Sequence, residues 1–259
     1  MIQIRLLAPC RREFEKDVYR PGVISLSRLI WGSLGGGLAL AAITLCSLGS
    51  GVSVLYPPLA ATCFINAACV YLRVARPRQV IVGHLVSSVA GLLAIPLGNA
   101  LAGGLPDGAY LPLKLGLAVT LAALFMQLFD ADHPPAAATA AIPALLPLPM
   151  ESLLLPLHMA WGSVIAVLAA LAWNRIWFDY PAPEGEGCPM CAGLHQNRME
   201  TLGFGLCVLA AGLMSLRPLW LALYQTGLWV MLAGGLVLML QHFAEARLVS
   251  RAVSGSKPS

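Results

Sequence analysis

Charged residues are scarce in this sequence. Only 11% of its 259 residues are Asp, Glu, Lys or Arg, whereas roughly 25% are charged in an average soluble domain. Hydrophobic residues make up 58% of the chain, and the formal net charge of +4 is small and dispersed. The weak charge argues against a nucleic-acid partner, because such partners require a concentrated basic surface. This composition favours a protein that lies in a lipid bilayer.

Long apolar runs dominate the sequence and predict an all-α polytopic membrane protein. Four runs approach the roughly 20 residues of a spanning helix, and they cover residues 29–48, 80–101, 113–129 and 153–173. Shorter or C-terminal runs cover residues 57–72, 134–146, 202–216 and 219–243. The last two are separated by Arg217-Pro218 and predict a helical hairpin. The total is six to eight membrane segments, and we expect eight.

Basic residues orient these segments. They concentrate before the first run, between the second and third runs, and after the last run. Because cytoplasmic loops carry an excess of Lys and Arg, we predict that all three regions are cytoplasmic. Eight segments satisfy this rule, with both termini inside the cell and the chain in the inner (plasma) membrane. Arg217 is the one external exception.

A heptapeptide occurs twice in matched surroundings. Tyr56-Pro-Pro-Leu-Ala-Ala-Thr62 returns 77 positions later as His133-Pro-Pro-Ala-Ala-Ala-Thr139, with five of seven residues identical. Each copy follows one apolar run and precedes another, so we predict two three-helix repeats. Three crossings per repeat would invert the second relative to the first. Re-entrant Pro-Pro segments would make the repeats parallel instead, but they would place the arginines of 73–78 on the outer face.

The predicted boundaries follow from these runs. The membrane domain covers 29–178, with one repeat at 29–101 and the other at 113–178. A basic cytoplasmic leader, residues 1–28, precedes it. A cytoplasmic Cys-x-x-Cys loop (179–200), a transmembrane hairpin (201–243) and a cytoplasmic tail (244–259) follow it.

The Pro-Pro pairs predict two short helices whose ends suit an anion. Proline fits the first turn of a helix and disfavours helical backbone at the preceding residue, so Tyr56 and His133 are predicted at or before the N-cap. Free N–H groups and the helix dipole favour anions there, and the alanines that follow permit close approach. The predicted substrate-binding residues are Tyr56, Pro57, Pro58, Thr62, Asn66, His84, His133, Pro134, Pro135 and Thr139.

Two carboxylates precede the second copy of the heptapeptide. Asp130, Asp132 and His133 together could take up a proton, because histidine titrates near neutral pH. Alternatively, Asp132 is a helix cap and Asp130 a cytoplasmic interface residue. Unless they are protonated or paired, the carboxylates would repel an anion. His158 is predicted close to the outer boundary, as an interface anchor.

Two stretches carry a family resemblance. Residues 132–140, Asp-His-Pro-Pro-Ala-Ala-Ala-Thr-Ala, resemble the signature of the HPP family of integral membrane proteins. Residues 76–85, Arg-Pro-Arg-Gln-Val-Ile-Val-Gly-His-Leu, are similar to the second recognisable block of that family. The resemblance covers roughly residues 29–177. Some plastid and cyanobacterial members are associated with nitrite uptake, which implies nitrite as a candidate substrate.

A Cys-x-x-Cys motif lies in the polar loop at 179–200. Cys188 and Cys191, with His195 four residues later, supply three metal ligands, whereas a structural zinc site normally has four. A second subunit or Glu186 would complete it. A redox dithiol and a plain loop are the alternatives in a reducing cytoplasm, and a periplasmic loop would favour a disulfide. The Cys-His pair of c-type haem attachment is absent.

Two functional hypotheses follow. The first is a transporter or channel for a small inorganic anion, nitrite-like, with its site at the starts of the two Pro-Pro helices. The second is a membrane-embedded metal or redox sensor, or an assembly factor, that works through the loop at 188–191. No nucleophile–base constellation is visible, so we do not expect an enzyme. The expected partners are the anion and the bilayer, and the Gly32-x-x-x-Gly36 surface suits a neighbouring helix or a second subunit.

Overall fold

The computed structural model describes residues 5–7, 23–69, 72–101, 109–177 and 198–255. The helices in this part of the chain confirm the all-α polytopic prediction. They are α1 (Ser33–Ser50), α2 (Tyr56–Ala68), α3 (Pro77–Leu101), α4 (Tyr110–Leu128), α5 (Pro134–Leu145), α6 (Leu155–Trp177), α7 (Arg198–Ser215) and α8 (Leu221–Gly255).

Short elements complete the described chain. A π-helical turn, η2 (Ser27–Gly32), leads directly into α1, and two 3₁₀ turns, η3 (Arg73–Ala75) and η5 (Ser152–Leu154), precede α3 and α6. Strands β1 (Arg5–Leu7) and β2 (Val23–Ser25) form a small parallel pair within the predicted leader. The sequence analysis did not predict this pair.

Five of the described helical segments are long and apolar enough to cross a membrane. They are Leu29–Ser50, Pro77–Leu101, Tyr110–Leu128, Ser152–Ile176 and Leu221–Ala244. The two Pro-Pro helices are half-length, since α2 has 13 residues and α5 has 12. A multi-pass membrane protein is therefore confirmed, while the number of crossings and the orientation of the termini stay predictions.

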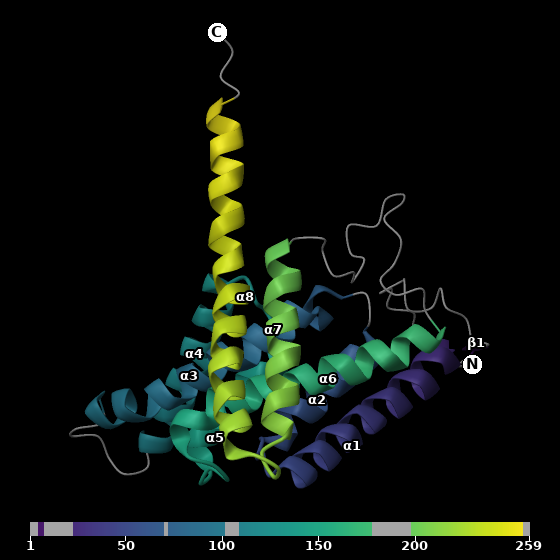
Figure 1. The fold of residues 1–259 in the computed structure, drawn as a ribbon, viewed down its shortest axis with the longest axis horizontal. Coiled ribbons are helices and arrows are strands. Elements are labelled where there is room, and N and C mark those ends of the chain that lie inside the picture. Colours follow the sequence, from purple (N-terminus) through teal and green to yellow (C-terminus); the bar gives the residue numbers. More distant parts are fainter. Residues whose placement is uncertain (1–4, 8–22, 70–71, 102–108, 178–197, 256–259) are drawn as a thin grey trace, which may run out of the picture.

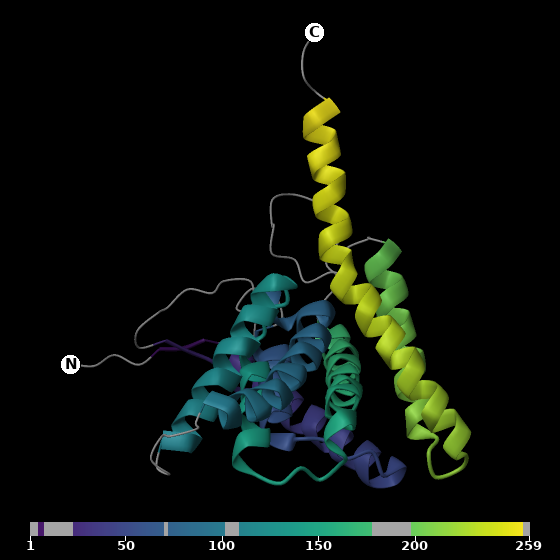
Figure 2. The ribbon, with the colours of Figure 1, turned by 90° about the vertical axis from the view of Figure 1, so that its left-hand side faces the viewer.

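The helices pack as a bundle with a hairpin on its flank. Helices α1 and α6 lie side by side, and α3 packs against α4, α5 and α6 (Figure 1). Helices α7 and α8 form the predicted hairpin, and the C-terminal part of α8 projects beyond the other helices (Figure 2). The hairpin contacts the bundle mainly through α6 and α3.

The third helix of each predicted repeat packs against the first two helices of the other repeat. Helix α3 packs against α4 and α5, and α6 packs against α1 and α2, while α2 and α5 contact each other. Helix α5 begins beside Val74, just beyond the end of α2, because the His133 ring lies 2.7 Å from the Val74 carbonyl oxygen. An inverted repeat would make the two half-length helices run in opposite directions, and both this antiparallel course and the equivalence of the whole repeats stay predictions.

The prolines set the starts of both half-length helices. His133 is the N-cap of α5 with extended backbone, as the residue before proline favours. In α2 the N-cap is Leu55, and Tyr56 is already helical. Pro57 is therefore the second residue of α2, one position later than we predicted. Proline is tolerated there because the N–H groups of the whole first turn lack partners within the helix. The alternative in which Asp132 caps α5 is not seen.

Candidate functional site

The two threonines of the duplicated heptapeptide contact the same histidine. Thr62 Oγ1 lies 2.8 Å from Nε2 of His84, and Thr139 Oγ1 lies 2.9 Å from Nδ1 of the same ring. His84 belongs to α3, and all three residues are fully buried. One ring on α3 therefore joins α2 to α5.

His133 extends this arrangement toward the end of the bundle where α5 begins. Its Nε2 lies 2.8 Å from Thr62 Oγ1, and its Nδ1 lies 2.7 Å from the Val74 carbonyl oxygen. The centroids of the His84 and His133 rings are 5.3 Å apart. Thr62, His84, His133 and Thr139 together form what we call the His–Thr cluster. All four are among the substrate-binding residues that the sequence predicts.

The hydrogens of the His–Thr cluster can be assigned from its contacts. A carbonyl oxygen only accepts, so with neutral rings His133 carries its hydrogen on Nδ1, and its Nε2 accepts from the Thr62 hydroxyl. Thr62 has then used its only hydrogen, so His84 donates to it from Nε2. His84 Nδ1 in turn accepts from Thr139. The cluster is one directed chain of hydrogen bonds that ends at Val74.

Glycines in α3 let α5 approach closely enough to build this cluster. A Cβ atom on Gly83 would lie 2.9 Å from His133 Cβ and 3.2 Å from the Ala131 carbonyl oxygen. A Cβ atom on Gly91 would overlap the backbone of Ala140. The two sequence blocks that resemble the HPP family, residues 76–85 and 132–140, therefore pack directly against each other.

Arg78 fixes the end of α4 beside the His–Thr cluster. Its guanidinium donates to the carbonyl oxygens of Asp130 and Phe129 at 2.8 and 2.6 Å, and to that of Leu238 in α8 at 3.1 Å. Asp130 has a φ of 52°, which is uncommon for a residue with a Cβ atom. Its carboxylate pairs with Arg73 and lies 3.6 Å from Arg78 Nη1 and 4.0 Å from His242.

The structure does not bring together the proton-coupling group of the sequence analysis, Asp130, Asp132 and His133. Both ring nitrogens of His133 have other partners, Thr62 and the Val74 carbonyl. Asp130 turns toward two arginines, and Asp132 is exposed. Neither carboxylate therefore occupies a hydrogen-bonding position on the His133 ring.

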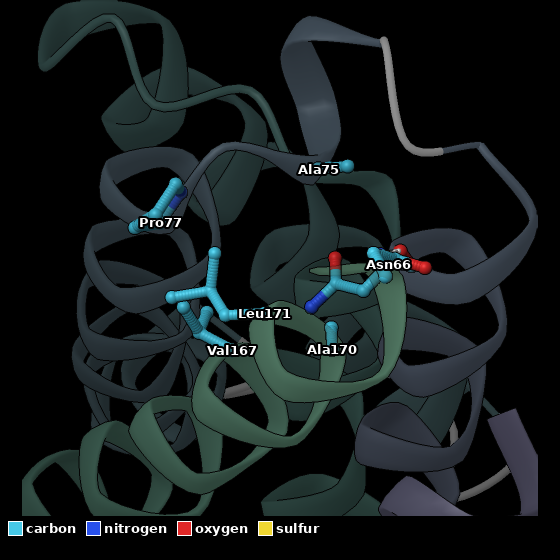
Figure 3. A pocket seen from close by; sticks show the side chains of 7 residues that line it. Asn66, Ala75, Pro77, Val167, Ala170 and Leu171 are labelled. Atoms are coloured by element: carbon cyan, nitrogen blue, oxygen red, sulfur yellow. Dashed lines mark hydrogen bonds between the residues drawn. The ribbon is translucent and has the colours of Figure 1, made fainter. Parts of the chain in front are cut away.

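Tyr56 and Asn66 also lie outside the cluster's hydrogen bonds. The Tyr56 hydroxyl donates to Ser47 Oγ in α1 at 3.0 Å, although Tyr56 occupies the position equivalent to His133 in the heptapeptide. Asn66, one turn beyond Thr62, lines a small pocket with Asn174 of α6 (Figure 3). Pro57, Pro58, Pro134 and Pro135 form the first turns of α2 and α5. Asn174 was not predicted.

A third buried histidine joins the hairpin to the bundle. His158 is 2% exposed, its Nδ1 lies 2.8 Å from the Ser53 carbonyl oxygen, and its Nε2 lies 2.7 Å from the Tyr224 hydroxyl of α8. The sequence analysis placed His158 at the interface, as an anchor. Its position within a long apolar run was the signal for an internal role, because ionisable groups inside membrane helices usually face the bundle.

The Cys-x-x-Cys loop lies outside the described residues, and so do Cys188, Cys191 and His195. Among the residues that are described, no group of three or more His, Cys, Asp and Glu side chains could hold a metal ion. The zinc site therefore stays a prediction.

Comparison with known proteins identifies the family. The family model described as "HPP, transmembrane region" matches residues 21–181, which is more than half of the chain. The matched range contains α1 to α6 and the whole His–Thr cluster, while α7 and α8 follow it. No curated protein and no solved structure matches. The chain belongs to the HPP transmembrane family and is a multi-pass membrane protein.

Proposed function

We propose that this protein transports a small inorganic anion, nitrite or an ion of similar size, across the inner membrane. The observation that carries the proposal is the convergence of the duplicated threonines on His84. Ionisable side chains inside membrane bundles are costly and usually mark substrate or proton pathways. Interrupted helices whose ends form a site near the bilayer midplane are also typical of secondary transporters. We therefore infer a transporter rather than an enzyme.

The charges at the His133 end support an anionic substrate. Three arginines, Arg73, Arg76 and Arg78, lie there against two carboxylates, Asp130 and Asp132. Asp130 is paired with Arg73 and is close to Arg78, so its repulsion of an anion is reduced. The positive end of the α5 dipole adds to the favourable potential at this end.

The His–Thr cluster is closed in the described conformation. Its four side chains are fully buried and satisfy one another, so an anion must separate α2 from α3 or α5 to pass. The hydroxyl groups of Thr62 and Thr139 and the N–H groups of the two histidines would then donate to the anion.

A proton can act on the same cluster. When His133 is protonated, its Nε2 becomes a donor, and the Thr62 hydroxyl must turn away. The Pro58 carbonyl oxygen, 3.1 Å from Thr62 Oγ1, is the acceptor that it can turn to. The cluster would then carry a positive charge beside the anion. We propose that His133, rather than Asp130 or Asp132, couples a proton to anion movement.

Charged side chains of the described residues lie near His133, at the end of the bundle where α5 begins. Arg73 and Arg78 pair with Asp130, Asp132 is exposed, and His242 of α8 lies 4.0 Å from the Asp130 carboxylate. Helix α3 contributes His84, whose ring centroid is 5.3 Å from that of His133. The arginines oppose a charge on His133, and an entering anion would favour it. Anion and proton would therefore bind together.

The test is anion flux into liposomes that contain the purified protein. Nitrite uptake would be measured with and without a pH gradient for the wild type, His133→Ala and His242→Ala. His242→Ala is the matched control, because this histidine lies at the same end of the bundle but outside the His–Thr cluster. We expect uptake that responds to the gradient, is lost in His133→Ala and is retained in His242→Ala. Equal uptake in all three proteins would rule out the proposed site.

A further inference from the structure

A small pocket lies one helical turn from the His–Thr cluster. Helix α2 contributes Asn66, helix α6 contributes Asn174, and the segment that enters α3 covers the pocket (Figure 3). Its apolar walls are formed by Ala75, Pro77, Val167, Ala170 and Leu171. The two asparagines are the polar side chains of this lining.

Three polar side-chain atoms of the pocket lack hydrogen-bond partners among the described residues. Both Nδ2 and Oδ1 of Asn66 are buried without a hydrogen bond, and so is Oδ1 of Asn174. Each of the two residues is only 3% exposed. The Asn174 amide is held in place because its Nδ2 donates to the Asn66 carbonyl oxygen at 3.0 Å. Buried polar groups are nearly always paired, so these three atoms indicate a bound ligand.

The size and chemistry of the pocket identify the class of ligand. The cavity volume is about 10 Å³, close to the roughly 10–15 Å³ that one water molecule requires. Asn66 offers a donor and an acceptor, and Asn174 offers a second acceptor. Water can donate to both oxygens and accept from the Asn66 amide at the same time. We propose that one buried water molecule bridges Asn66 and Asn174.

From its position we infer that this water hydrates the transported anion, a role that rests on the proposed transport function. Asn66 follows Thr62 by four residues, so both side chains lie on one face of α2. Ala75 lines the pocket, and its neighbour Val74 accepts the last hydrogen bond of the His–Thr cluster. The water therefore lies next to the cluster on the way to the end where Arg73 is found. It is the first hydration contact for an anion that moves between the cluster and that end.

Hydroxyl-radical footprinting in ¹⁸O-labelled water detects such a molecule without any flux. Radicals formed from the bound water should label Val167, which lines the pocket and is 2% exposed. Asn66→Leu keeps the branched shape and the number of side-chain heavy atoms and removes both partners that Asn66 offers, so we expect the Val167 label to disappear. Asn99→Leu is the matched control, because Asn99 lies exposed on α3 and its replacement should leave the label unchanged.

Thermal unfolding provides a second readout. If the pocket holds water, Asn66→Leu breaks a satisfied hydrogen-bond network and lowers the melting temperature. If it is dry, the same change removes an unpaired amide and raises it. Equal labelling of Val167 in Asn66→Leu and the wild type, or a higher melting temperature of that variant, would overturn the water site. Neither readout depends on transport, so the water site and the anion flux can fail separately.

Discussion

Thr62 and Thr139 are 77 positions apart in the sequence, yet their hydroxyl oxygens lie 2.8 and 2.9 Å from opposite nitrogens of the His84 ring. A neutral histidine can serve both threonines in this way, because one of its two ring nitrogens donates and the other accepts. The two copies of the heptapeptide thus meet at the side chain of His84, which belongs to α3 and lies outside both copies. This relationship gives the first prediction.

Thr62→Val should disrupt the cluster with little change in volume. The Thr62 hydroxyl serves His84 and His133 at once, so valine leaves two buried ring nitrogens without a partner. We expect a loss of stability of about 1–3 kcal/mol and a fall in anion flux of roughly tenfold or more, which corresponds to about 1.4 kcal/mol of barrier. Thr62→Ser keeps the hydroxyl and should retain both. Flux assays in liposomes and thermal unfolding would measure these effects, and similar behaviour of the two variants would contradict the assignment.

Close packing of α3 on α5 gives the second prediction. Gly83→Ala places a Cβ atom 2.9 Å from His133 Cβ, so α5 must shift and the His133 hydrogen bonds must lengthen. We expect a loss of stability of about 1–3 kcal/mol from this overpacking, together with reduced flux. Gly116→Ala in α4 is the control, because nothing lies within 4 Å of its added Cβ atom. It should be neutral or stabilising by about 1 kcal/mol. Equal melting temperatures of the two variants would contradict the packing argument.

Some of the site could be predicted from the sequence because its signals are local. The Pro-Pro pairs indicated the starts of α2 and α5 to within one residue. His84 and His133 were recognised because histidines are rare and costly inside apolar runs. These signals depend on residue type and neighbours along the chain, which a sequence displays directly.

The partners of these residues could not be predicted, because they depend on packing between distant segments. Tyr56 is the sequence counterpart of His133, but its hydroxyl reaches Ser47 in α1. The Val74 carbonyl and Asn174 carry no motif, and they become part of the site only through the crossing of helices. His158 was predicted at the interface, since its internal partner Tyr224 lies 66 residues away in the sequence and no local signal joins the two.

The Cys-x-x-Cys loop gives the third prediction, which separates the two functional hypotheses. The double variant Cys188→Ser and Cys191→Ser should leave anion flux nearly unchanged, because the proposed pathway lies within the part of the chain that contains α2, α3 and α5. Flux would be measured in liposomes beside the wild type, with the zinc content of both proteins determined by elemental analysis. Complete loss of flux, together with loss of bound zinc, would favour the sensor or assembly hypothesis.

Arg78 gives the last prediction, because it joins the family domain to the hairpin beyond it. Its guanidinium donates to carbonyl oxygens of Phe129 and Asp130 at the end of α4 and of Leu238 in α8. Lysine keeps the charge but lacks the planar fork needed for three separate acceptors. We expect Arg78→Lys to lose about 1–3 kcal/mol of stability as buried carbonyls become unpaired, and to loosen α8 in hydrogen-exchange measurements. Arg175→Lys, at an exposed position of α6, is the control. Unchanged exchange in α8 would show that Arg78 does not hold the hairpin, and that its other contacts, such as the His158–Tyr224 hydrogen bond, suffice.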